Sequence, residues 1–280
     1  GVVAGVAPVV CGTVTNGTAG GSVPAGLTIQ LHTLDQNMAE TVTETPLGAD
    51  GTFSFANVSI QNGLSYVTTV AYQGRIFNSA FVVGDPANPA LTLPITIYDL
   101  TADVSVIEIS SLVTQVFVEA DQLQVAQIIR FNNKSDRLFT TDEAVAADQF
   151  ASIKLDLPAG ATILGFNDAS DRFLTNGSTV IDTMPVQPGT NHVIHVVYSL
   201  PFSAGGTTLT ETLPYPLSGM VHLRATPPDL DVVASFGGQA LPSLGQTDSS
   251  GSTYAAFGGP FSVPASTSLR YSFQGGNGGD

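Results

Sequence analysis

The sequence predicts an all-β protein made of two tandem β-sandwich domains, and three observations lead to that prediction. Apolar and polar residues alternate through many short segments, as they do in strands that bury one face. Gly, Pro, Asn and Asp separate these segments at close to the spacing that is typical of sandwiches. A chain of 280 residues also has room for two domains that each bury a core.

The clearest element is a hairpin within residues 48–74. Asp50-Gly51 supplies the positive-φ residue that a tight reversal needs. Phe53 and Phe55 then fall on one face of a strand, because strand side chains repeat every second residue. Asn62-Gly63 makes the next reversal, and a second alternating strand follows it.

Two segments upstream of the hairpin extend the pattern. Residues 12–17 start a strand and a turn, and residues 24–31 give a strand with Leu27, Ile29 and Leu31 on one side. The four segments read, in order, G-T-V-x-N-G, P-x-G-x-T-I-x-L, D-G-x-F-x-F-x-x-V and Y-x-x-x-V-x-Y-x-G. This series resembles the carboxypeptidase regulatory-like, or transthyretin-like, β-sandwich domain over about residues 11–100. The resemblance implies a small scaffold or spacer domain without catalysis of its own.

We place the first sandwich at residues 11–103 and a second, larger sandwich at residues 104–280, with a linker at 99–103. Strands are expected at 75–83 and 91–98, then at 104–109, 115–118, 123–131, 153–157, 161–166, 178–181, 193–200, 209–213, 220–225, 231–236, 254–257 and 269–273. The sequence Thr-Thr-Asp-Glu at 140–143 has the form of a capping box and predicts a helical turn or two at 144–147.

An uncharged apolar segment, residues 1–10, precedes the first predicted strand. It either extends that strand within its own domain or acts as a donor strand that pairs with the sheet edge of a neighbouring copy. Pro8 cannot donate a ladder hydrogen bond, so the strand would lie at an edge or break there. Under the donor interpretation, the residues that contact the other subunit are Val2, Val3, Val6, Val9 and Val10.

Composition argues against several classes of partner. Apolar residues make up 43% of the chain and charged residues 11%, which is typical of a stiff extracellular β protein. The net charge of −15 argues against nucleic acid and anionic membrane surfaces. No apolar run approaches the roughly 18 residues of a membrane helix, so we expect no membrane span. A start at Gly1 without a basic leader suggests that a signal peptide has been removed.

The sequence shows no catalytic motif, and we expect neither an enzyme nor a cofactor. His192 and His195 stand three apart on one strand and face opposite ways, so they cannot hold one metal ion. Residues 167–171 crowd carboxylates and amides as calcium sites do, but a solvated turn is favoured. Cys11, the sole cysteine, is interpreted as a small buried apolar residue, with a bond between subunits as the alternative.

Four segments match the N-glycosylation acceptor pattern, with plain turn chemistry as the alternative; they begin at Asn16, Asn57, Asn133 and Asn176. Taken together, the features predict a non-enzymatic structural subunit of an extracellular filament or other cell-surface assembly, whose partners are copies of itself. The alternative is an adhesin or binding module that recognises surface glycans or protein through aromatic residues such as Tyr215, Tyr254 and Phe257.

Overall fold

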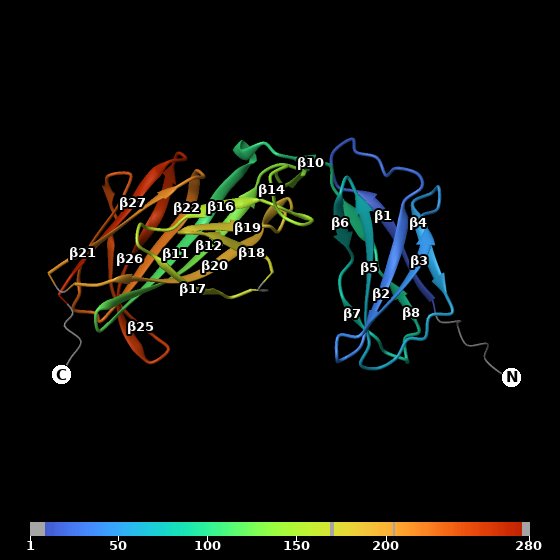
Figure 1. Ribbon diagram of the computed structural model, residues 1–280, viewed down its shortest axis with the longest axis horizontal. Helices are drawn as coiled ribbons and strands as arrows, with labels where there is room; N and C mark the ends of the chain where they lie inside the picture. Colours follow the sequence, from blue (N-terminus) through green and yellow to red (C-terminus); the bar gives the residue numbers. More distant parts are fainter. Residues whose placement is uncertain (1–8, 169–170, 204, 276–280) are drawn as a thin grey trace. The chain divides into compact units, whose positions relative to one another are not determined.

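The computed structural model describes residues 9–168, 171–203 and 205–275, most of which lie in β-strands (Figure 1). The all-β fold class is therefore confirmed. The chain divides into two compact units, unit 1 at residues 1–100 and unit 2 at residues 101–280. The division follows Leu100 instead of Asp103, and β10 (Leu100–Thr101) spans it.

Unit 1 is a sandwich of two sheets. Its strands are β1 (Val9–Asn16), β2 (Thr28–Leu34), β3 (Glu40–Pro46), β4 (Thr52–Ala56), β5 (Ser65–Tyr72), β6 (Arg75–Asn78), β7 (Val82–Val83), β8 (Ala90–Thr92) and β9 (Ile95–Ile97). One sheet has the order β3-β2-β5-β6, with β7 also paired to β5. The other has the order β4-β1-β8, with β9 also paired to β1.

The hairpin predicted within residues 48–74 is wrong, because its two strands lie in different sheets: β4 pairs with β1, whereas β5 pairs with β2, β6 and β7. The turns and the buried face predicted in this segment are present. Gly51 and Gly63 both adopt a φ of 79°, in the left-handed region that a residue with a side chain avoids. Phe53 and Phe55 on β4 are each 4% exposed and face inward, as predicted. Opposite Phe53 stands Gly12, where a Cβ atom would lie 2.5 Å from the phenylalanine ring, so the glycine lets β1 pass close to it.

The described part of unit 2 contains one large sheet, two smaller sheets of three and four strands, and short two-stranded pairings. Its main strands are β11 (Ile107–Glu119), β12 (Gln122–Asn133), β16 (Ile153–Asp156), β17 (Thr162–Phe166), β18 (Phe173–Asn176), β19 (Thr179–Asp182), β20 (Gly189–Pro201), β21 (Thr207–Leu213), β22 (Leu217–Thr226), β23 (Asp231–Phe236), β24 (Gln239–Ala240), β25 (Ser243–Ser249), β26 (Ser252–Val263) and β27 (Thr267–Gln274). The seven-stranded sheet has the order β17-β20-β12-β11-β22-β26-β25. The smaller sheets have the orders β16-β19-β18 and β21-β27-β23-β24.

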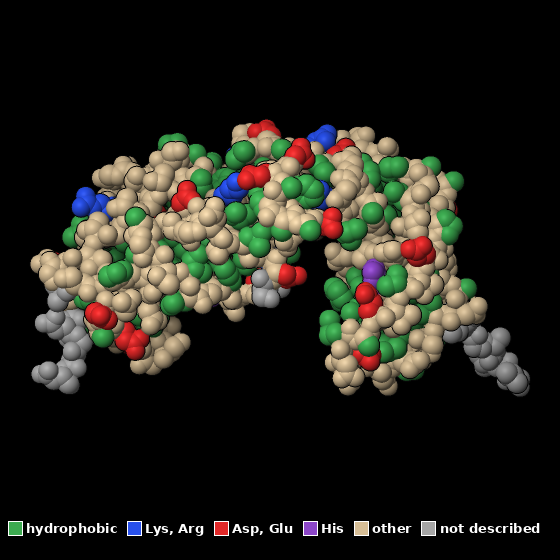
Figure 2. Space-filling view, viewed as in Figure 1, with side chains coloured by type: hydrophobic (Ala, Val, Ile, Leu, Met, Phe, Trp, Pro, Cys, Tyr) green, Lys and Arg blue, Asp and Glu red, His purple; other side chains and the backbone are tan. Residues whose placement is uncertain are grey.

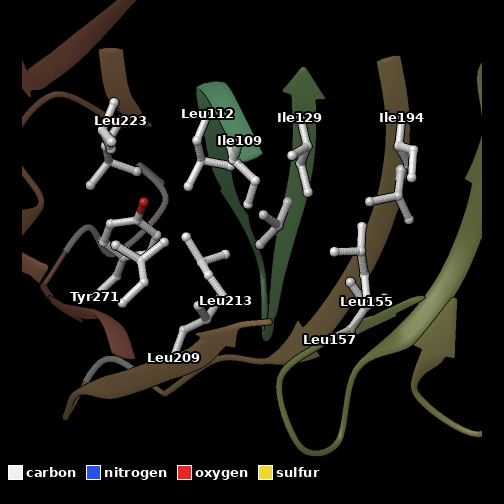
Figure 3. Close-up of a cluster of buried hydrophobic side chains, with 14 of the residues drawn as sticks. Ile109, Leu112, Ile129, Leu155, Leu157, Ile194, Leu209, Leu213, Leu223 and Tyr271 are labelled. Atoms are coloured by element: carbon white, nitrogen blue, oxygen red, sulfur yellow. The ribbon is translucent and has the colours of Figure 1, made fainter. Parts of the chain in front are cut away.

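The core of unit 2 lies between one face of the seven-stranded sheet and both smaller sheets. Figure 3 shows Leu112, Ile129 and Ile194 of the large sheet together with Leu155 of β16 and Tyr271 of β27. These side chains are at most 4% exposed, and they belong to a single cluster of buried apolar residues. Alternation therefore selects which residues are buried, because each strand turns every second side chain inward.

A β-bulge between β11 and β22 requires a glycine. The two strands run parallel, and their register shifts between Ile109 and Ser111. At Gly219, opposite this shift, a Cβ atom would lie 1.9 Å from the main-chain oxygen of Ser110. Only a residue without a side chain allows the two backbones to approach this closely.

The helical turn predicted at residues 144–147 is wrong. These residues form β14 (Ala144–Ala146), which pairs with β15 (Gln149–Phe150) in a short hairpin. The Glu143 side chain pairs with Lys154 at 2.6 Å instead of capping a helix. The main chain is also bonded across the hairpin, since the N–H of Ala151 donates to the carbonyl of Glu143. Tertiary pairing has therefore overridden a local helix signal.

Candidate functional site

A buried ionic cluster joins β18, β19 and β20 in unit 2. Asp182 at the end of β19 is fully buried and receives a bidentate interaction from Arg172, with Nε at 2.9 Å and Nη2 at 2.6 Å. His192 Nε2 lies 2.8 Å from the same carboxylate. The guanidinium also bonds to Asp168, donates to the carbonyl of Val193, and lies over the Phe173 ring at 4.7 Å.

The electrostatics of this cluster favour an ionised carboxylate. Burial alone would raise the pKa of Asp182, but hydrogen bonds from Arg172 and His192 outweigh it and hold the pKa below its ordinary value. The side chain of His192 is 4% exposed and that of Asp182 is completely enclosed. The cluster therefore ties three segments of unit 2 together, and its carboxylate and imidazole do not face solvent where a substrate would meet them.

A second polar group lies deep in the core of unit 2. Glu211 of β21 accepts a hydrogen bond from Gln127 Nε2 at 2.7 Å and a long one from the Tyr198 hydroxyl at 3.4 Å. Burial raises the pKa of Glu211 from 4.5 to about 7. Within the described part of the chain, Gln127 Oε1 has no hydrogen-bond partner. Because burial disfavours the charged carboxylate, the core is suited to the neutral acid.

The surface carries shallow hollows, and one of them lies between the edges of two sheets. This hollow of about 420 Å³ is lined by β17 and β18, together with Asp168. Phe166 and Phe173, which both line it, stack on one another with ring centroids 4.4 Å apart. Leu164 on β17 is 54% exposed. We name this feature the β17–β18 groove, defined by Ile163, Leu164, Gly165, Phe166, Asp168, Phe173 and Thr175.

Two of the predicted subunit-contact residues lie in β1. Val10 is fully buried and pairs with Phe55 on one side and Leu91 on the other, and Val9 beside it is half-buried. Because its own sandwich uses the Val10 side chain, that residue is not available to fill a pocket in another copy. The other three, Val2, Val3 and Val6, lie outside the described residues.

The four predicted glycosylation asparagines divide into two pairs. Asn133 is 2% exposed, and its amide donates to the carbonyls of Arg137 and Val186, so a glycan there would break the fold. The amide of Asn16 likewise donates to Ser22 and Asp99. The other two are exposed, Asn57 at a turn and Asn176 at the end of β18, and remain candidate acceptors.

The described histidines show no metal centre. His192 faces inward and His195 outward on β20, which confirms the predicted opposition of the pair. His32 contacts Glu40 at 2.6 Å and Thr69 at 2.8 Å. Across residues 9–168, 171–203 and 205–275, no three His, Cys, Asp or Glu side chains gather as metal ligands would.

Several other predicted features differ from expectation in their exposure. Cys11 is a free thiol that is only half-buried on β1. Tyr215 and Tyr254 are 6% and 5% exposed, and Phe257 is half-buried, so these rings do not present flat faces on which a sugar could stack.

None of the described segments is a helix of the length and apolarity that a membrane crossing requires.

The geometry defines this chain as an all-β protein of two β-sandwich units, and comparison with known proteins adds only a remote likeness. No protein-family model and no curated protein matches the sequence. Among solved structures, the M1 zinc metallopeptidase from Deinococcus radiodurans aligns at a TM-score of 0.38 and 15% identity. A mutant of it bound to a Tyr-Ser-Ala substrate aligns at 0.39 and 15%. Each alignment covers 59% of this chain and 42% of the other, so the chain spans under half the length of those proteins. A likeness at this level supports no inference about activity.

Proposed function

We propose that the chain is a non-enzymatic structural subunit of an extracellular filament or other cell-surface assembly, and that copies associate by strand addition through residues 1–8. The observation that carries the proposal is the contrast between this segment and β1. Residues 1–8 are Gly-Val-Val-Ala-Gly-Val-Ala-Pro, uncharged and apolar, in a chain whose net charge is −15. Val10, which follows them, already belongs to the core of unit 1.

The architecture supports a mechanical role. Three central strands of the large sheet, β11, β12 and β20, are 12 or 13 residues long, where an ordinary strand has about 5–6. The ionic side chains of Arg172, Asp182 and His192 bond to one another and so connect neighbouring strands. Figure 2 shows that charged side chains are sparse on the visible face and that hydrophobic atoms reach the surface, as suits a subunit that packs against copies.

We further propose that unit 1 is a transthyretin-like scaffold domain. Its support is the series of motifs at residues 12–17, 24–31, 50–58 and 66–74, together with the two-sheet sandwich into which these segments fold. Such a domain would act as a spacer in an assembly. A location outside the cell belongs to the same proposal, and its support is a composition with 11% charged residues.

Electron microscopy tests the proposed function. We expect the full chain to form assemblies and a chain that lacks residues 1–8 to form none. The deletion stops before Val9 because Val9 and Val10 lie in β1, so the sandwich remains intact. The matched control replaces residues 275–280 of the Gly-rich tail with an unrelated Gly-Ser sequence. Normal assemblies from the deleted chain would contradict the proposal, and sub-millimolar glycan binding by monomers would favour the adhesin alternative.

A further inference from the structure

The large sheet of unit 2 ends in the edge strand β17, which has an irregular register with β20 between Ile163 and Gly165 but no charged residue or proline. Among the described strands, β17 pairs with β20 alone, so its other edge offers main-chain donors and acceptors. Its sequence, Thr-Ile-Leu-Gly-Phe, contains neither a charge nor a proline. By contrast β3, an edge strand of unit 1, carries Glu40, Glu44 and Pro46. Charged residues and proline are devices that keep edges from pairing, so β17 is the more receptive of the two.

The β17–β18 groove gives this edge a place for side chains as well as for main chain. Both strands lie at the ends of their sheets, β17 in the seven-stranded sheet and β18 in the three-stranded one (Figure 1). The stacked rings of Phe166 and Phe173 are part of its lining and connect β17 to β18. Leu164 leaves more than half of its side chain in solvent. A segment with small apolar side chains would bury this surface.

We infer that the β17–β18 groove is the acceptor for residues 1–8 of a second copy of the chain. The inference rests on the proposed function and names its receiving site. Residues 2–6, Val-Val-Ala-Gly-Val, equal the five residues of β17 in length. In an extended strand Val2, Ala4 and Val6 share one face, and a face of this size fits a hollow of about 420 Å³. Main-chain pairing along β17 supplies affinity, and the groove supplies specificity.

Charge favours the same pairing. The chain carries a net charge of −15, so two copies repel one another on approach. An uncharged donor meeting an edge that is itself uncharged avoids this repulsion at the contact. The one carboxylate at the groove, Asp168, is bonded to Arg172 and is thereby compensated.

Disulfide trapping between two versions of the full chain tests the inference. Both versions carry Cys11→Ala, which removes the native thiol. One carries a cysteine at Val2, Val3 or Val6 in turn, and the other carries Leu164→Cys. We expect a covalent dimer of the two versions on mild oxidation. The matched control is Val83→Cys, at a residue of unit 1 that is 68% exposed on β7. Linkage to Val83→Cys at the same yield, or to neither site, would overturn the inference.

A charge variant separates this inference from the proposed function. Because Leu164 is largely exposed, Leu164→Lys should fold normally, which thermal unfolding verifies. We expect it to weaken association at least about tenfold, a factor that corresponds to about 1.4 kcal/mol. Val83→Lys should leave association unchanged. Normal assembly by Leu164→Lys would reject the groove while leaving the proposed function intact. If the unmodified chain does not assemble, the proposed function itself is wrong.

Discussion

Replacement of Glu211 by glutamine should change how the stability of the chain depends on pH. Glu211 is enclosed in the core of unit 2, and its hydrogen bonds come from the neutral donors Gln127 and Tyr198. No cation contacts it among the described residues. Ionisation would therefore leave a buried charge without compensation, which is why burial raises the pKa to about 7.

The sign and the size of the effect follow from linkage. Between pH 4.5 and 7 the unfolded chain loses the Glu211 proton while the folded chain keeps it, so the free energy of unfolding falls as the pH rises. The shift from 4.5 to about 7 is roughly 2.5 pKa units, and each unit corresponds to about 1.4 kcal/mol. Glu211 should therefore lower the free energy of unfolding by about 3 kcal/mol between pH 4 and pH 8. Glu211→Gln should not show this decrease.

Urea unfolding of the full chain, followed by circular dichroism at pH 4 to 8, measures this difference. We expect the stability of Glu211→Gln relative to the unmodified chain to rise with pH by about 3 kcal/mol. The exposed carboxylate of Asp229 provides a control, since Asp229→Asn should show no comparable trend. A stability difference that stays constant across this pH range would show that Glu211 does not remain protonated in the folded core.

Two further substitutions test the packing of unit 2. Arg172→Ala leaves Asp182 buried without its cation and should lower the free energy of unfolding by about 3–5 kcal/mol, whereas Arg270→Ala at an exposed position should change it by less than about 0.5 kcal/mol. Equal effects in urea unfolding would refute the role of the ion pair. Gly219→Ala should cost about 1–3 kcal/mol through the clash at the bulge, while Gly165→Ala, whose Cβ atom would meet nothing within 4 Å, should cost less. A thermal melt that ranks the two glycines the other way would contradict this explanation.

The sequence was sufficient to predict strands wherever turn chemistry and alternation agree. The turns at Asp50-Gly51 and Asn62-Gly63 occur as predicted, because glycine there takes a positive φ, but the strands after them do not pair as the predicted hairpin. Residues 119–122 join β11 to β12, also as predicted. By contrast β3 was missed, because Glu-Thr-Val-Thr-Glu-Thr-Pro is an exposed edge strand without an apolar face. Its existence depends on pairing with β2, which local sequence does not reveal.

Local pattern failed where a distant partner decides the structure. Residues 104–106 were expected to begin a strand, but they form a short 3-10 helix whose N-terminus is capped by Asp103. The strand starts at Ile107 and continues for 13 residues through the bulge, so the two predicted strands at 104–109 and 115–118 are one. The parallel pairing of β11 with β22 joins residues about a hundred positions apart. Periodicity carries no information about such a pairing.

The polar clusters of unit 2 were not predicted from the sequence. Glu211 lies between Leu209 and Leu213 in an alternating strand, so its inward direction could have been read from the sequence. The ionic cluster was harder to predict from the sequence, because Arg172 and Asp182 stand ten residues apart on either side of a hairpin. The sequence correctly placed His192 and His195 on opposite faces of one strand. It did not identify Asp182 as the carboxylate partner of His192.

Sedimentation equilibrium of the full chain in dilute buffer is the most direct test of the central claim that copies associate through residues 1–8. We expect a mass well above the 28.9 kDa of one chain, and a return to the single-chain mass when residues 1–8 are removed. A full chain that sediments as a clean monomer of 28.9 kDa across the accessible concentrations would contradict the claim.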